Sequence, residues 1–212
     1  MAMIHHADPP VDPSAIERLR EAAATCKACH LWENATQTVF GAGRPDARVM
    51  LIGEQPGDQE DRIGQPFVGP AGKVLDRALL AAGINRGEVY LTNAVKHFKW
   101  EWRGRRRLHV KPTRQEITAC HPWLEEEIRV LRPRAIVCLG ATAAGALLGR
   151  SLKISSARGH PVRSDLAPSV FVTVHPSYIL RLPQEAQRAA EFDALVDDLR
   201  LVHAALAGAE TR

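Results

Sequence analysis

The amino-acid sequence predicts an α/β fold, a three-layer sandwich in which helices cover both faces of a short, mainly parallel four-stranded sheet. Four short apolar runs have the character of strands, at residues 48–53, 89–95, 135–140 and 170–175. Three of these runs are apolar on both faces, which is typical of parallel strands buried between helices. Helix-forming segments alternate with the runs, and this alternation favours a layered domain with right-handed crossovers.

Helices are expected at residues 13–25, 71–82, 113–131, 142–148 and 184–207. Asp12 and Pro13 are a cap residue and a proline at the first helical position, which favours a helix start there. Thr113 and Glu116 have the spacing of a capping box. Pro122 is expected to break or kink the third of these helices, because proline lacks the backbone N–H that a helix interior needs.

Composition and length indicate one globular domain. The chain has 212 residues, of which 45% are hydrophobic and 25% charged, and we assign residues 13–208 to the domain and residues 1–12 to a flexible tail. No apolar run reaches about 18 residues, which excludes a membrane span. The N-terminus lacks a basic start followed by an apolar stretch, so no secretory signal is expected and we predict a cytoplasmic, bacterial-type protein.

Positive charge is concentrated in one segment. The formal net charge of +4 is too small to establish a nucleic-acid partner by itself. Residues 97–114 nevertheless contain seven Lys or Arg and one Glu, so the rest of the chain is slightly acidic. Phe98, Trp100 and Trp102 are interleaved with these cations, a pattern on which the bases of single-stranded nucleic acid stack. A solvated loop is the alternative interpretation.

The four cysteines suggest a metal centre. Cys26 and Cys29 form a C-x2-C pair, and Cys120 and Cys138 follow far along the chain. Four thiolates in a reducing compartment suit zinc or a [4Fe–4S] cluster, and the wide separation of the second pair favours the cluster. Two free buried cysteines beside an accidental C-x2-C are the alternative. The CKACH segment also matches a haem-attachment pattern, which would require export and would leave two cysteines unexplained.

Polar side chains follow the predicted strands, where ligands bind in parallel α/β sheets. The glycine-rich stretch after the first strand, the end of the second strand and the end of the fourth carry Glu54, Asp58, Glu60, Asp61, Phe67, Asn93 and His175. Alone, Asn93 could be a strand-end cap and His175 a structural histidine. Together, an aromatic ring, an amide, an imidazole and carboxylates are what an enzyme acting on a flipped-out base needs.

Several segments resemble a known family. GEQPGDQEDRIGQPFVGPAG, LTNAVKHFK, VHPSYILR and the cysteine spacing resemble the iron–sulfur uracil-DNA glycosylases of family 4, over roughly residues 20–205. Gln55 and the basic segment ending RRRLH, residues 105–109, are most similar to the UdgX branch. The motif of that branch reads KRRIH, so this chain has Arg for Lys and Leu for Ile.

The resemblance implies a cofactor and a base pocket. It implies a [4Fe–4S] cluster that pins the N-terminal helix and is held by Cys26, Cys29, Cys120 and Cys138. It also implies that uracil is extruded from DNA. The aromatic residues of the basic segment favour single-stranded DNA as the substrate. In the pocket Phe67 would stack on uracil, Asn93 would read its pairing edge, and Gln55 would line the wall. His175 would stabilise the negative charge that develops on the uracil O2 atom.

The UdgX branch implies covalent capture of the DNA. His109 would attack the sugar C1′ atom after uracil leaves, with Glu54 as the carboxylate partner of the imidazole and Asp58 as a polar neighbour. DNA contacts are expected from Arg105, Arg106, Arg107, Lys111 and Ser177. The alternatives are a conventional glycosylase that turns over, and an iron–sulfur nucleic-acid binder without catalysis. We expect a monomer.

Overall fold

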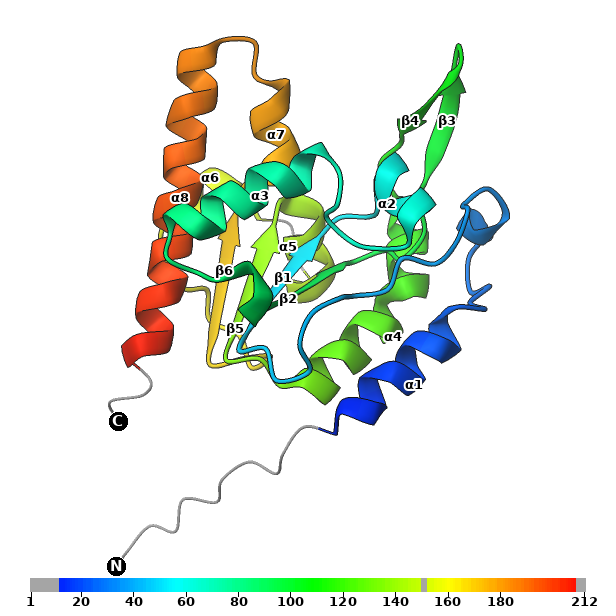
Figure 1. Ribbon diagram of the computed structural model, residues 1–212, viewed down its shortest axis with the longest axis horizontal. Helices are drawn as coiled ribbons and strands as arrows, with labels where there is room; N and C mark the ends of the chain where they lie inside the picture. Colours follow the sequence, from blue (N-terminus) through cyan, green and yellow to red (C-terminus); the bar gives the residue numbers. More distant parts are fainter. Residues whose placement is uncertain (1–11, 150–151, 209–212) are drawn as a thin grey trace, which may run out of the picture.

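The computed structural model describes residues 12–149 and 152–208 and contains a central parallel sheet (Figure 1). The strands are β1 (Val49–Gly53), β2 (Val89–Asn93), β5 (Ala135–Leu139) and β6 (Ser169–Thr173), in the order β2-β1-β5-β6. These four strands confirm the strands that the apolar runs predict. The tail expected at residues 1–12 lies outside the described residues except for Asp12, whose side chain caps the first helix by accepting a hydrogen bond from Ser14 N.

Alternate residues of the strands contact different helical layers. In β1, Val49 and Leu51 pack on the side of α3 (Pro70–Ala81) and α8 (Glu185–Gly208). Met50 and Ile52 pack on the opposite side, against α1 (Pro13–Ala23), α4 (Arg114–Leu131) and α5 (Ala141–Leu148). Figure 1 shows α3 and α8 on one side of the sheet and α1 and α4 on the other. The predicted three-layer fold is therefore confirmed.

The long helix α4 continues through its proline. Pro122 lies inside the helix, so the prediction of a break there is wrong. Cys120, Leu124 and Ile128 form a buried face on the same helix, and packing of such a face supplies most of the stability of a helix in a protein. Burial therefore outweighs the hydrogen bond that the proline removes.

Two segments without a predicted helix or strand contain secondary structure. The glycine-rich stretch includes α2 (Asp58–Ile63), and the basic segment forms an antiparallel hairpin of β3 (Trp100–Arg103) and β4 (Arg106–His109). The hairpin projects from the body of the molecule beside α2 (Figure 1). Short helices α6 (Ile154–Ala157) and α7 (Pro176–Arg181) and two 3-10 turns, His30–Glu33 and Arg86–Glu88, complete the described fold. None of the described helices is long and apolar enough to cross a bilayer.

A buried ion pair lies beneath the end of β2. Lys96 is 1% exposed, and its Nζ atom lies 2.5 Å from an oxygen of Glu127, which is fully buried. The ammonium also donates to Thr92 Oγ1 and to the carbonyl of Asn93, at 2.7 and 2.8 Å. Glu127 accepts further hydrogen bonds from Tyr90 and from the Gly41 amide. This network fixes the backbone where the chain leaves β2.

We predict that Glu127→Gln lowers the free energy of unfolding by about 3 kcal/mol, because the substitution leaves the Lys96 charge buried without its partner. Denaturant unfolding measures the change. The control is Glu126→Gln, which removes an exposed ion pair with Arg129 and should cost less than about 1 kcal/mol. Equal losses in the two variants would contradict this assignment.

Candidate functional site

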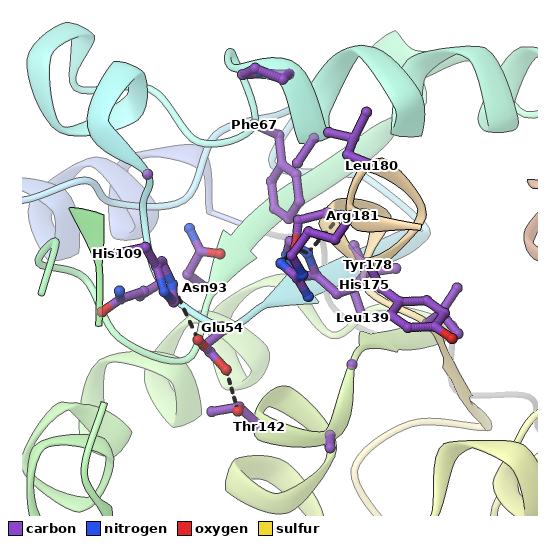
Figure 2. A pocket seen from close by; sticks show the side chains of 18 of the residues that line it. Glu54, Phe67, Asn93, His109, Leu139, Thr142, His175, Tyr178, Leu180 and Arg181 are labelled. Carbon is purple, nitrogen blue, oxygen red and sulfur yellow. Dashed lines mark hydrogen bonds and ion pairs between the residues drawn. The ribbon is translucent and has the colours of Figure 1, made fainter. Parts of the chain in front are cut away.

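The carboxyl ends of the strands surround a cavity of about 1220 Å³. Glu54, Phe67, Asn93, His109 and His175 all line it, so the structure brings together the residues that follow the three strands and the end of the hairpin. In Figure 2, His109, Glu54 and Asn93 lie on one side of the cavity, while Phe67 and His175 lie on the other.

Phe67 and Asn93 form a narrow slot. Phe67 has a backbone φ of +58°, a conformation that is unusual for a bulky residue and is typical of constrained functional sites. Its ring stacks on that of His175 with centroids 6.1 Å apart. Gly53 ends β1 beside this slot, and a Cβ atom there would collide with Asn93 Oδ1 and the Phe67 ring. The glycine therefore allows a planar ring and an amide to approach each other closely.

His175 is a neutral hydrogen-bond donor. It precedes α7, and its Nδ1 atom accepts a hydrogen bond of 3.1 Å from the Ser177 amide. The Nε2 atom therefore carries the proton of the neutral ring. Burial lowers the pKa of His175 to about 4. Ser177 was expected to contact DNA, but its hydroxyl lies 2.8 Å from the same Nδ1 atom and accepts a hydrogen bond from Arg181.

His109 lies against Glu54. Its Nε2 atom is 3.2 Å from Glu54 Oε1, and the Thr142 hydroxyl donates a short hydrogen bond to Glu54 Oε2 (Figure 2). Burial raises the pKa of Glu54, but the hydrogen bonds from His109 and Thr142 and the charge of His109 outweigh burial, so the pKa is below its usual value. An ionised carboxylate in this position can orient the imidazole and stabilise positive charge on it.

Arg107 anchors the hairpin and is not available for phosphate. Its side chain is 9% exposed, with Nε 2.5 Å from Asp58 Oδ1 and Nη1 2.7 Å from Asp61 Oδ2. The guanidinium also lies over the rings of Phe98 and Trp100, at 5.5 and 5.3 Å. The expected DNA role of Arg107 is therefore corrected. Asp58, which was expected to act in catalysis, is a partner of this anchor.

Gln55 also holds the hairpin. Its Nε2 atom donates to the carbonyls of Lys99 and Val110, both at 3.1 Å, and its Oε1 atom accepts from the Lys99 amide at 3.1 Å. These contacts join the two chain segments at the base of the hairpin. Gln55 lines the cavity as expected, but its side-chain amide is committed to this clamp rather than to a bound base.

The exposed end of the hairpin is cationic. Arg105 and Arg106 are exposed, and Lys111 at the base is exposed and lines the cavity. Arg103 pairs across the strands with Arg106 and adds a cation that the sequence did not single out. Trp102 is 64% exposed and packs edge-on against Trp100 with ring centroids 4.9 Å apart. The tip therefore presents positive charge and an aromatic surface to solvent.

Three of the four cysteines gather between α4 and the segment after α1. Burial raises the pKa of Cys120 to about 11, and the charges of Cys26 and Cys29 raise it as well. This interaction indicates that the three thiols are neighbours. Each sulfur accepts an N–H group: Cys26 from Trp123 at 3.1 Å, Cys120 from the Lys96 amide at 3.2 Å, and Cys29 from Leu31. Such hydrogen bonds stabilise thiolates that bind a cluster.

Cys138 does not join this group. It lies in β5 between Ile52 and Val172 on the neighbouring strands and is fully buried in the core. Burial alone raises its pKa, to about 12. The expectation of a site made by all four cysteines therefore does not fit the structure. Within the described residues, no group of three or more His, Cys, Asp or Glu side chains is already arranged around a metal position.

Comparison with known proteins identifies the class. Residues 40–200 match the family model of the Uracil DNA glycosylase superfamily. A type-4 uracil-DNA glycosylase of Thermotoga maritima is 39% identical over 167 residues, which cover 78% of this chain and 83% of the relative. The type-4 enzyme of Pyrobaculum aerophilum is 35% identical over 175 residues, covering 79% of this chain and 86% of the relative.

A third relative agrees with these two. The type-4 uracil-DNA glycosylase of Archaeoglobus fulgidus is 34% identical over 167 residues, with 76% of this chain and 80% of the relative covered. The chain therefore belongs to the uracil-DNA glycosylase superfamily, and the three relatives are all of its type-4 group. The parallel sheet flanked by helices is consistent with the fold of this superfamily.

We predict that His175 destabilises the folded protein in acid. Its folded pKa is about 4, below the unfolded value of about 6.5, so only the unfolded state gains a proton as the pH falls between these values. This difference removes about 3 kcal/mol of stability across that range. Denaturant unfolding at several pH values should show a shallower acid loss for His175→Gln than for the parent. The exposed His160→Gln is the control, and a parent-like pH dependence in His175→Gln would contradict the assignment.

Proposed function

We propose that this protein excises uracil from DNA and then captures the abasic sugar covalently through His109. The observation that carries the proposal is the contact of 3.2 Å between His109 and Glu54, at the edge of a cavity that also holds Phe67, Asn93 and His175. A neutral imidazole beside a carboxylate can act as a nucleophile near neutral pH. The excision step itself is supported by the type-4 relatives.

The slot suits an extruded uracil. The Phe67 ring provides a stacking surface. No described residue forms a hydrogen bond with the side-chain amide of Asn93, so this amide is available to the pairing edge of the base. The Nε2–H group of neutral His175 would donate to uracil O2. As the C1′–N1 bond breaks, its electron pair moves onto the uracil ring, and a fixed donor to O2 stabilises this charge by about 3 kcal/mol.

The imidazole of His109 then replaces water as the nucleophile. A nitrogen lone pair forms a bond to the cationic C1′ atom, and the resulting positive charge on the ring is balanced by the Glu54 carboxylate. The departing uracil anion takes a proton from solvent. Atoms and charge balance without a further reactant, and the protein ends joined to an abasic site.

The hairpin favours a single-stranded substrate. Arg103, Arg105 and Arg106 would contact phosphates, while exposed Trp102 offers a surface for an unpaired base. Stacking of a base on an aromatic side chain contributes about 1–3 kcal/mol and requires a base free of its partner strand.

We further propose that Cys26, Cys29 and Cys120 bind an iron–sulfur cluster of the [4Fe–4S] type, without Cys138. The N–H groups directed at the three sulfurs support this assignment. The cluster would tie the end of α1 to α4, and it takes no part in the chemical steps described above.

For the catalytic proposal, the protein is incubated with a single-stranded oligonucleotide containing uracil and analysed on a denaturing gel. We expect a uracil-dependent band of protein plus DNA that resists boiling in detergent. His109→Gly should lose the band and release free uracil, because water can then reach C1′. Asn93→Ala should slow excision about 100-fold. His121→Gln, on the outer face of α4, controls for loss of a histidine.

Three other results of this experiment would each contradict part of the proposed function. A full-strength band with His109→Gly would show that another residue is the nucleophile. Free uracil without a band from the parent would indicate a conventional glycosylase, with His109 as a hairpin residue only. Binding without uracil release would leave a non-catalytic nucleic-acid binder.

The cluster is tested by iron and sulfide content per folded chain. Cys120→Ala should lose most of both, because it removes one of the three proposed ligands. Cys138→Ala should retain the parental content, since its thiol lies in the sheet. Loss of iron from folded Cys138→Ala, with retention in Cys120→Ala, would reverse the assignment.

A further inference from the structure

The turn between β5 and α5 touches two residues of the proposed active site. Gly140 in this turn has a φ of +91°, and a Cβ atom there would come within 3.0 Å of the Cβ atom of His175. The Gly140 amide donates to the carbonyl of Thr173 at 2.8 Å, which fixes the turn to β6. The turn is therefore held in place from β6, directly against His175.

Thr142 follows in the first turn of α5. Its side chain lines the cavity, and the residue is 9% exposed. Its hydroxyl donates to Glu54 Oε2, while the other oxygen of the same carboxylate faces His109. Figure 2 shows His109, Glu54 and Thr142 joined in this order by two dashed contacts. Glu54 thus links the hairpin to the first turn of α5.

We propose that Thr142 is a positioning residue that fixes the Glu54 carboxylate for its action on His109. The proposal rests on the function proposed above. A glutamate side chain has several rotatable bonds, and the contact with His109 alone would leave the carboxylate free to turn. A second hydrogen bond to the opposite oxygen restricts the carboxylate to one orientation. The rate of a bond-forming step depends on such accurate placement of the groups involved.

The charge environment of Glu54 makes the role of Thr142 measurable. The titratable groups that act on Glu54 are His109 from the hairpin and His175 from the segment before α7, whereas α5 contributes the Thr142 hydroxyl. Loss of this hydrogen bond removes one of the interactions that keep the pKa of Glu54 below its usual value. Glu54 would then become protonated at a higher pH than in the parent.

The test uses Thr142→Val, which keeps the shape and removes the hydroxyl, and Thr142→Ser, which keeps the hydroxyl. Adduct formation with a single-stranded uracil oligonucleotide is followed under single turnover, at saturating protein, from about pH 4 to about pH 8. Thr142→Val should form the adduct at least about tenfold more slowly, and the acid limb of its pH profile should move toward neutral pH. Thr142→Ser should restore both, and oligonucleotide affinity should be unchanged.

A purely structural role predicts something different. If Thr142→Val melts at a lower temperature but its folded molecules keep the parental rate and pH profile, the inference is overturned. Should the parent form no uracil-dependent adduct, the proposed function fails instead. The contact is then tested by NMR titration of Glu54 in the free protein. A higher Glu54 pKa in Thr142→Val supports the positioning contact, and an unchanged pKa overturns it.

Discussion

The ion pairs of Arg107 hold the β3–β4 hairpin against α2, and the place of His109 depends on them. Asp61 is fully buried and is itself fixed by the amide and hydroxyl of Thr36, at 2.9 and 2.6 Å. A buried carboxylate of this kind needs its cationic partner, and removing one member of such a pair is strongly destabilising. Arg107 and His109 are two residues apart on β4, so their side chains lie on the same face of the strand.

The site has two halves, one built on the parallel sheet and one on the β3–β4 hairpin. Asn93, Phe67 and His175 are positioned by the parallel sheet and by helices packed on both of its faces. The hairpin has only two strands, and such a pair is marginally stable without additional packing. The Arg107 ion pairs and the Gln55 clamp supply this support. Glu54 lies where the two halves meet, since it directly follows β1 and contacts His109 of the hairpin.

The sequence predicted the sheet and the residues at its strand ends, because both depend on local apolar patterns that the core preserves. It could not separate Arg107 from Arg105 and Arg106, since three consecutive arginines look alike until strand pairing turns the third toward α2. It also missed Thr142, whose contact with Glu54 joins residues far apart in the chain. Cys138 could have been recognised: it lies inside the apolar run 135–140, where alternation places it in the core.

We infer that the anchored hairpin brings His109 to the reacting sugar. The most direct test compares Arg107→Gln with Arg106→Gln in the rate of uracil-dependent adduct formation, at saturating protein and single turnover. We predict that Arg107→Gln forms the adduct about 100-fold more slowly and releases free uracil, whereas Arg106→Gln reacts at nearly the parental rate. A parental rate in Arg107→Gln, or equal losses in both variants, would show that the Arg107 ion pairs do not position His109.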